Sequence, residues 1–191
     1  MRVQCNATPR PGSFVPDDTC TPRQFLLMYS FLMLLIRPAT ISDVPLLRTM
    51  IRELAEFERK VQFCAIEEAD LVRDGFGANP KFRALLAEWA GQPAGYALFF
   101  DYYSTWAGAG LYLEDVFVRE PFRGKGIGTD LLAAAARIAV QEKCCAMRWE
   151  VLDWNKRAIA LYESLGAEFC DEWRSVLLTD DALLRLAEKA S

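Results

Sequence analysis

A glycine-rich turn between a strand and a helix constrains the fold of this chain more than any other feature. Residues 118–132 read VREPFRGKGIGTDLL, so three glycines alternate with Lys125 and Ile127. The apolar segment before the turn, LYLEDVFV at 111–118, has the composition of a central β-strand. The alanine- and leucine-rich segment after it, 127–142, favours a helix. The sequence therefore predicts a strand–turn–helix unit whose turn requires the backbone freedom of glycine.

Glycines at such a joint indicate a binding site for an anion. Backbone N–H groups at a helix start have no partner within the helix, and the helix dipole adds positive potential there. Without a Cβ at Gly124, Gly126 and Gly128, a phosphate can approach that backbone closely. Arg123 and Lys125 add positive charge at the same place. The run predicts a diphosphate cradle, with a purely structural tight turn as the alternative for the glycines alone.

The spacing of the glycines excludes two common phosphate-binding fingerprints. A P-loop needs a lysine and a serine or threonine after its last glycine, whereas Gly128 is followed by Thr129 and Asp130. A dinucleotide fingerprint would need a further glycine at Asp130 or Leu131.

Composition favours an ordinary globular domain that binds a small molecule. The chain has 191 residues, 52% of them hydrophobic and 25% charged, which is enough for one compact domain with its own core. Its formal net charge of −4 argues against nucleic acid as a partner and slightly favours cationic or neutral small molecules.

Cysteine and histidine usage restricts the chemistry. The six cysteines show no CxxC spacing and histidine is absent, so we expect no metal site and no histidine-based catalytic dyad or triad. Reduced thiols in a cytoplasmic protein are the simplest interpretation of these cysteines.

The first 32 residues differ from the rest of the chain. They contain Pro9, Pro11, Pro16 and Pro22 and show little periodicity. The apolar run at 25–36 is shorter than the roughly 20 residues of a membrane span. We therefore expect no membrane association and interpret residues 1–32 as a leader that is disordered or not native.

Two blocks of the sequence resemble the GNAT family of N-acetyltransferases. The segment EDVFVREPFRGKGIGTDLL at 114–132 resembles the acetyl-CoA signature Arg/Gln-x-x-Gly-x-Gly/Ala, which falls here on Arg123, Gly126 and Gly128. The segment DWNKRAIALYESLGAEF at 153–169 resembles a later block of that family in order and spacing.

The resemblance implies an α/β protein with the GNAT fold. We expect a single domain over residues 33–191, with a mixed, mostly antiparallel central sheet flanked by helices. The residue pattern agrees with the family's element order. It places further strands at 146–152, near 167–170 and at 173–178.

Further segments resemble the spermidine/spermine N-acetyltransferase branch, which includes thialysine acetyltransferase-like members. They are IRPAT at 36–40, IRELAEFE at 51–58 and DGFG at 74–77. This resemblance implies direct transfer of acetyl from acetyl-CoA to a primary amine of a small cationic substrate, by a homodimer. Phe57 stands where the polyamine enzymes tend to have tyrosine, so a diamine, a polyamine and a thialysine-like amino acid all remain open as acceptors.

The resemblance also assigns the residues that would bind acetyl-CoA. The backbone of one strand would pair with the pantetheine arm, the glycine turn would hold the diphosphate, and the later block would approach the lower pantetheine. These residues are Val116, Phe117, Val118, Arg123, Gly124, Lys125, Gly126, Ile127, Gly128, Thr129, Asn155, Lys156, Arg157, Ala158 and Tyr162. Asn155 has a simple helix cap as its alternative role.

The expected reaction needs a base and an acid. An alkylammonium with a pKa near 10.4 is deprotonated in only about one molecule in 2,500 at pH 7, a deficit of roughly 4.6 kcal/mol. Glu114, a carboxylate within an apolar strand, matches the family position that contacts the amine, often through water. Strand alternation would place its neighbour Asp115 on the opposite face. Tyr162 matches the family's acid, with a core tyrosine as the alternative.

The acceptor site is expected to be acidic. Glu58 shares a helical face with Ile51 and Leu54 and lies near a helix C-terminus, where the dipole disfavours an anion unless a cation is nearby. The other positions that match the family's substrate-lining residues are Phe57, Glu114, Arg148, Trp149, Glu150 and Trp173.

Two alternative functions stay open. A protein or peptide N-acetyltransferase of the same family would need an open groove, whereas Glu58 favours a closed acidic site. A non-catalytic acetyl-CoA sensor would keep RGKGIG at 123–128 and would need neither Tyr162 nor Glu114.

Overall fold

A computed structural model describes residues 33–190. They divide into two compact units, and the boundary along the chain lies between Trp149 and Glu150. The leader expected for residues 1–32 lies outside the described residues. The strands of the first unit are β1 (Leu34–Pro38), β2 (Arg83–Trp89), β3 (Gln92–Ser104), β4 (Gly108–Val118) and β5 (Met147–Arg148). Its helices are α2 (Val44–Phe57), α3 (Glu68–Phe76) and α4 (Ile127–Gln141), with short 3-10 turns at Ile41–Asp43, Val61–Phe63 and Glu120–Phe122.

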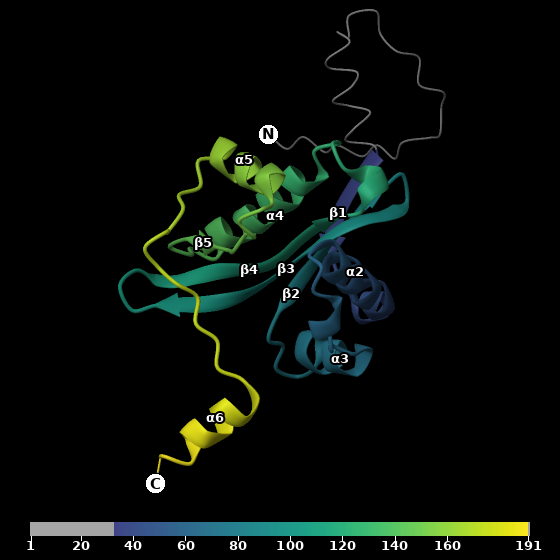
Figure 1. Ribbon diagram of the computed structural model, residues 1–191. Helices are drawn as coiled ribbons and strands as arrows, with labels where there is room; N and C mark the ends of the chain where they lie inside the picture. Colours follow the sequence, from purple (N-terminus) through teal and green to yellow (C-terminus); the bar gives the residue numbers. More distant parts are fainter. Residues whose placement is uncertain (1–32, 191) are drawn as a thin grey trace, which may run out of the picture. The chain divides into compact units, whose positions relative to one another are not determined.

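One sheet runs through the first unit, in the order β1-β2-β3-β4-β5 (Figure 1). Three of its four ladders are antiparallel, and only β4 and β5 pair in parallel. The expected mixed, mostly antiparallel GNAT sheet is confirmed. The β2–β3 connection is a two-residue turn at Ala90 and Gly91, whose φ values of 50° and 74° match the twist of the strands it joins.

Helices cover both faces of this sheet. One face packs against α2 and α3 through a core that includes Leu47, Met50, Tyr96 and Phe117. Figure 1 shows α4 on the other face, and its buried side chains include Leu131. A side chain on β3 or β4 therefore belongs either to the α2 face or to the α4 face.

A β-bulge at Glu114 changes the face to which the next residues of β4 belong. Leu113 lies opposite Phe99 and Asp115 lies opposite Leu98, so Glu114 is an extra residue without a counterpart on β3. Since Phe99 and Leu98 are consecutive, they occupy opposite faces of the sheet. Asp115 is therefore on the α2 face, where Leu98 packs in the core. From the sequence we expected Asp115 on the face opposite to Glu114. Strict alternation does not hold at a bulge, so the relative faces of these two carboxylates do not follow from it.

The strand expected at 146–152 is much shorter in the structure. Only Met147 and Arg148 pair with β4, opposite Leu111 and Tyr112. The ladder ends directly before the bulge, where the direction of β4 changes.

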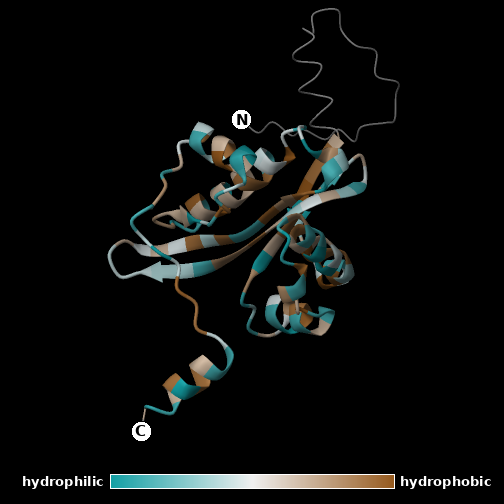
Figure 2. Cartoon of the chain, in the orientation of Figure 1, coloured by the Kyte–Doolittle hydropathy of each residue, from teal (hydrophilic) through white to brown (hydrophobic). Residues whose placement is uncertain are grey.

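The second unit contains α5 (Lys156–Ser164) and α6 (Asp180–Ala187). The strands expected near 167–170 and at 173–178 are wrong, because these residues form no ladder with any described strand. Figure 2 shows a hydrophobic stretch of extended chain before α6, in which Val176 is 90% exposed. β-Propensity alone predicted a strand there, but a strand also needs a partner.

Gly95 allows the close approach of β3 to β4, and its replacement by alanine should destabilise the fold. A Cβ at this position would overlap the backbone carbonyl oxygen of Phe117, which cannot rotate away. We expect Gly95→Ala to lower the free energy of unfolding by about 1–3 kcal/mol, measured by urea denaturation. Gly110→Ala is the comparison, because there the Cβ would meet the ring of Tyr102, a side chain that can move. Equal losses in both variants would contradict this account.

Candidate active site

The glycine turn lies at the start of α4, where the sequence predicts a cradle for an anion. Gly124 and Gly126 have φ values of 80° and 84°, a region that glycine adopts without strain. Gly126 is the N-cap of the 15-residue helix α4, and no side chain of the described residues caps its first N–H groups. These N–H groups and the positive end of the helix dipole are therefore available to an anion.

Gly128 has no structural requirement for glycine among the described residues. Its φ does not lie in the positive region, and a Cβ there would meet only Val118 Cγ2, at an ordinary 3.8 Å. Neither conformation nor packing within the described residues requires glycine at this position. The missing Cβ instead leaves the first turn of α4 open to a ligand, which fits a diphosphate.

Arg123 was expected only to add positive charge beside the glycines, but in the structure it also makes specific contacts. Its Nε donates a hydrogen bond to the Val118 carbonyl at 2.9 Å, and its guanidinium lies 4.7 Å from the ring centroid of Phe57. Lys125 places its ammonium 5.3 Å from the ring centroid of Trp89. Arg123 thus joins the turn to the end of α2 through cation–π contact.

The edge of β4 is suited to the backbone pairing expected for Val116–Val118. Because the ladder to β5 ends at Tyr112, β4 has only β3 as a ladder partner beyond that point among the described strands. An extended ligand chain can add to such an edge. The Val118 carbonyl, however, already accepts the hydrogen bond from Arg123.

Asp115 lies on the α2 face and experiences the charges of Glu114 and Glu58, and we call Glu58, Glu114 and Asp115 the acid cluster. The buried Tyr96 hydroxyl donates a hydrogen bond to Asp115 Oδ2 at 2.8 Å. Burial raises the pKa of Asp115 from 3.8 to about 6; the Tyr96 hydrogen bond opposes this shift, and the charges of Glu114 and Glu58 add to it. The predicted Glu58 and Glu114 therefore both act on Asp115 through their charges.

The position of Glu58 follows from the end of α2. Glu58 is the C-cap of that helix, directly after Phe57, as the sequence predicted. Arg119, the residue after β4, binds Glu53 with two hydrogen bonds of 2.8 Å. This ion pair fixes the last turns of α2, including Phe57 and Glu58, beside the end of β4.

Sequence reasoning missed Asp115 and Tyr96 as members of the site. Asp115 was expected on the face opposite to Glu114, because a bulge leaves no clear mark in the sequence. Tyr96 stands between small and apolar residues in PAGYALFF, as a core residue does. One usable indication was the pair of adjacent carboxylates, Glu114 and Asp115, within an otherwise apolar strand.

Other predicted site residues belong to β5 or to the second unit. Arg148 is exposed on β5 and Trp149 follows it, whereas Glu150 begins the second unit. Asn155 caps α5, with its Oδ1 accepting a hydrogen bond from the Ala158 N–H at 3.2 Å. Asn155 is thus a helix cap, and its expected approach to the lower pantetheine stays a prediction.

Tyr162 and Trp173 also lie in the second unit. Burial raises the pKa of the Tyr162 phenol, so this tyrosine stays protonated at neutral pH. Trp173 is 63% exposed, in the extended chain between α5 and α6. The functional roles of both residues, and those of Lys156, Arg157 and Ala158, stay predictions.

Comparison with known proteins identifies the family. The acetyltransferase (GNAT) family matches residues 48–167, which include the acid cluster, the glycine turn and Tyr162. The chain belongs to this family, and the predicted GNAT-type N-acetyltransferase is confirmed at that level.

Individual relatives agree with this assignment. The chain is 41% identical over 166 residues to a thialysine N-epsilon-acetyltransferase of Sus scrofa, covering 81% of this chain and 98% of that protein. It is 38% identical over 139 residues to a spermidine/spermine N(1)-acetyltransferase-like protein 1 of Homo sapiens, covering 69% of this chain and 20% of that protein. An aminoglycoside N-acetyltransferase solved in complex with CoA has the same fold, with a TM-score of 0.61, 19% identity and coverage of 78% and 95%.

Two further findings concern residues 33–190 alone. No group of three or more His, Cys, Asp or Glu side chains in this range is arranged to hold a metal ion. No helix in this range has both the length and the apolar character needed to cross a membrane.

Replacing Asp115 should stabilise the ligand-free protein at neutral pH. Because folding raises the pKa of Asp115 from 3.8 to about 6, the folded protein binds this proton more tightly than the unfolded chain. Stability therefore falls as pH rises from about 4 to about 6, and the loss persists above that range. We expect Asp115→Asn to gain about 1–3 kcal/mol over the parent above pH 6 and nothing below about pH 4, measured by urea denaturation across pH.

The exposed Asp101 provides the control for this prediction. It lies on β3 and pairs with Arg83 at 2.6 Å, so Asp101→Asn should show no such gain. A constant difference between parent and Asp115→Asn at all pH values would contradict the assigned burial of this charge.

Proposed function

We propose that this protein is an acetyl-CoA-dependent N-acetyltransferase that transfers acetyl directly to a primary amine of a small cationic substrate. The acceptor class is a thialysine-like amino acid, a diamine or a polyamine. Membership of the GNAT family and the names of the relatives support this proposal.

One observation carries the proposal: β4 connects an anion-binding turn to an acid cluster. Glu114 and Asp115 lie on the strand, and Gly124, the first glycine of the turn, follows six residues after the strand's end at Val118. A donor bound at the turn and extended along the edge of β4 would lie beside the acids. The two substrates of an acetyl transfer need this proximity.

Acetyl-CoA, when bound, supplies an activated acetyl thioester. The N–H groups of the turn and of the first turn of α4 would hold its diphosphate, and the carboxylates would hold the protonated amine. Glu114 would accept a proton from the amine, directly or through water. Tyr162 would donate a hydrogen bond to the leaving sulfur, whose thiol has an ordinary pKa near 8.5.

The acid cluster favours a cationic acceptor over a neutral one. Three carboxylates near one another repel, and a bound ammonium relieves this repulsion. A peptide acceptor stays the alternative, as does an acetyl-CoA sensor that transfers nothing. The homodimer and the cytoplasmic location expected from the sequence stay predictions.

An acetyl-transfer assay tests this proposal. The released CoA thiol is measured with thialysine, lysine, putrescine and spermidine, and CoA binding is followed separately by thermal stabilisation. We expect CoA to raise the melting temperature and at least one of these amines to be acetylated. CoA binding without transfer to any amine would favour the sensor, and no CoA binding would exclude the whole proposal.

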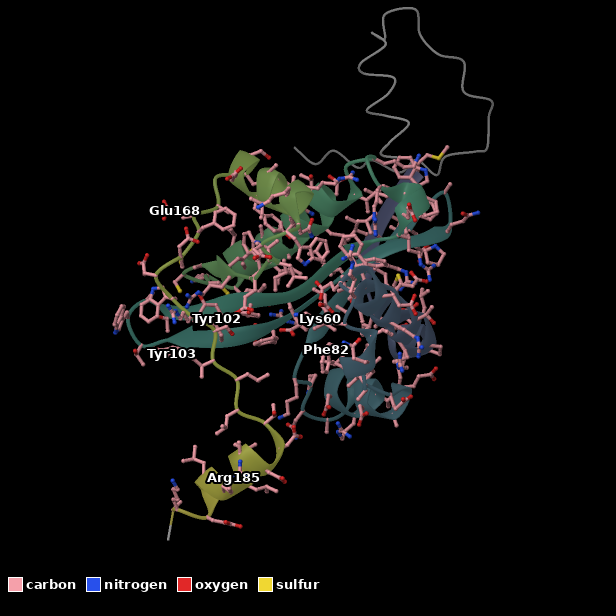
Figure 3. All side chains as sticks on the ribbon, in the orientation of Figure 1. Lys60, Phe82, Tyr102, Tyr103, Glu168 and Arg185 are labelled. Atoms are coloured by element: carbon pink, nitrogen blue, oxygen red, sulfur yellow. The ribbon has the colours of Figure 1, made fainter. Side chains whose placement is uncertain are left out.

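Replacing Tyr162 by phenylalanine should slow the reaction while leaving CoA binding intact. The change removes only the hydroxyl that would assist the leaving thiolate. We expect kcat to fall by about a hundredfold or more, with the dissociation constant for CoA within about twofold of the parent. Tyr103→Phe is the control, because Figure 3 shows Tyr103 near the end of the long hairpin, away from Lys60 and α2. Unchanged turnover in Tyr162→Phe would dismiss this residue as the acid.

A further inference from the structure

Tyr96, in the hydrophobic core of the α2 face, and the half-buried Asp115 beside it form a polar pair. Tyr96 has no exposed surface, and its neighbours in the core include Leu98 and Phe117, on the same face of the sheet. Its hydroxyl reaches Asp115 Oδ2 at 2.8 Å. A phenylalanine and an apolar partner would fill this space without the cost of burying a carboxylate, so stability alone does not explain the pair.

The charges that act on Asp115 are all negative. They are the carboxylates of Glu114, from the same bulge, and Glu58, from the end of α2. Cys64, which follows the turn at Val61–Phe63, acts on Tyr96. Arg123 places its guanidinium over the rings of Phe57 and Phe117. The arrangement thus raises the energy of the Asp115 carboxylate, and a cationic ligand would lower it.

We propose that Asp115 binds the ammonium group of the acceptor amine and that Tyr96 is the positioning residue that holds this carboxylate in place. This inference rests on the proposed function and extends it, because it separates two tasks within the acid cluster. Asp115 selects a cationic acceptor, whereas its neighbour Glu114 takes the proton. In that step an N–H bond of the ammonium breaks, an O–H bond forms on Glu114, and the electron pair stays on the nitrogen.

Only the ionised form of Asp115 attracts a cation, so acceptor binding should weaken as pH falls through the pKa of about 6. The Tyr96 hydroxyl lowers this pKa by donating to the carboxylate. Its removal should therefore raise the pKa and move the acidic limb of the pH profile to higher pH. A tyrosine with only a packing role would not move this limb.

The test measures kcat/KM against pH for the parent, Tyr96→Phe and Asp115→Asn, with the best acceptor amine. We expect Tyr96→Phe to shift the acidic limb upward by about half a pH unit or more. We expect Asp115→Asn to lose this limb and to raise KM for the amine at least about tenfold. The dissociation constant for CoA should stay within about twofold in both variants.

Two controls and one binding measurement complete the test. Tyr103→Phe and Asp101→Asn, on the same strand as Tyr96, should retain the parent profile. Amine added to the CoA-bound protein should raise the melting temperature of the parent but not of Asp115→Asn, which requires no turnover.

The outcomes separate this inference from the proposed function. If the parent acetylates an amine while both variants keep its KM and its acidic limb, the inference is overturned and the function stands. If the parent binds CoA but acetylates no amine, the proposed function fails and the inference fails with it.

Discussion

The bulge at Glu114 is the constraint on which the site depends. One extra residue in β4 carries Asp115 to the face that packs on α2, where its carboxylate meets the Tyr96 hydroxyl. The β5 ladder ends directly before the same point, which leaves the remaining edge of β4 open on that side among the described strands. A single insertion into one ladder thus places Asp115 beside the Tyr96 hydroxyl, close to the point where the β5 ladder ends.

The ionised Asp115 side chain carries an electrostatic cost in the folded protein. Burial and neighbouring negative charges oppose the ionisation of Asp115, and only one hydrogen bond favours it. The surrounding core is ordinary, with leucine, methionine and phenylalanine packed between α2 and the sheet. A carboxylate whose surroundings oppose its ionisation, in a fold that is otherwise well packed, is typical of a residue used in binding or catalysis.

Much of the fold could be predicted because its causes are local. Glycines at 124 and 126 meet a backbone requirement, and the apolar pattern of 127–142 gives a helix that ends within one residue of the expected position. The face of Asp115 could not be predicted, because it depends on the register against Leu98. The absence of the strand expected at 173–178 also depends on contacts between distant residues. A pairing partner decides whether an apolar segment joins a sheet.

Arg123 connects the glycine turn to the end of α2. Its guanidinium covers Phe57, at the end of the helix that carries Glu58, while its Nε is bound to the last carbonyl of β4. Movement of the turn around an incoming diphosphate would therefore disturb this stacked ring. Under the proposed function, a change in Phe57 caused by binding at one site would alter binding at the other by the same free energy, so the two substrates would be coupled through one aromatic ring.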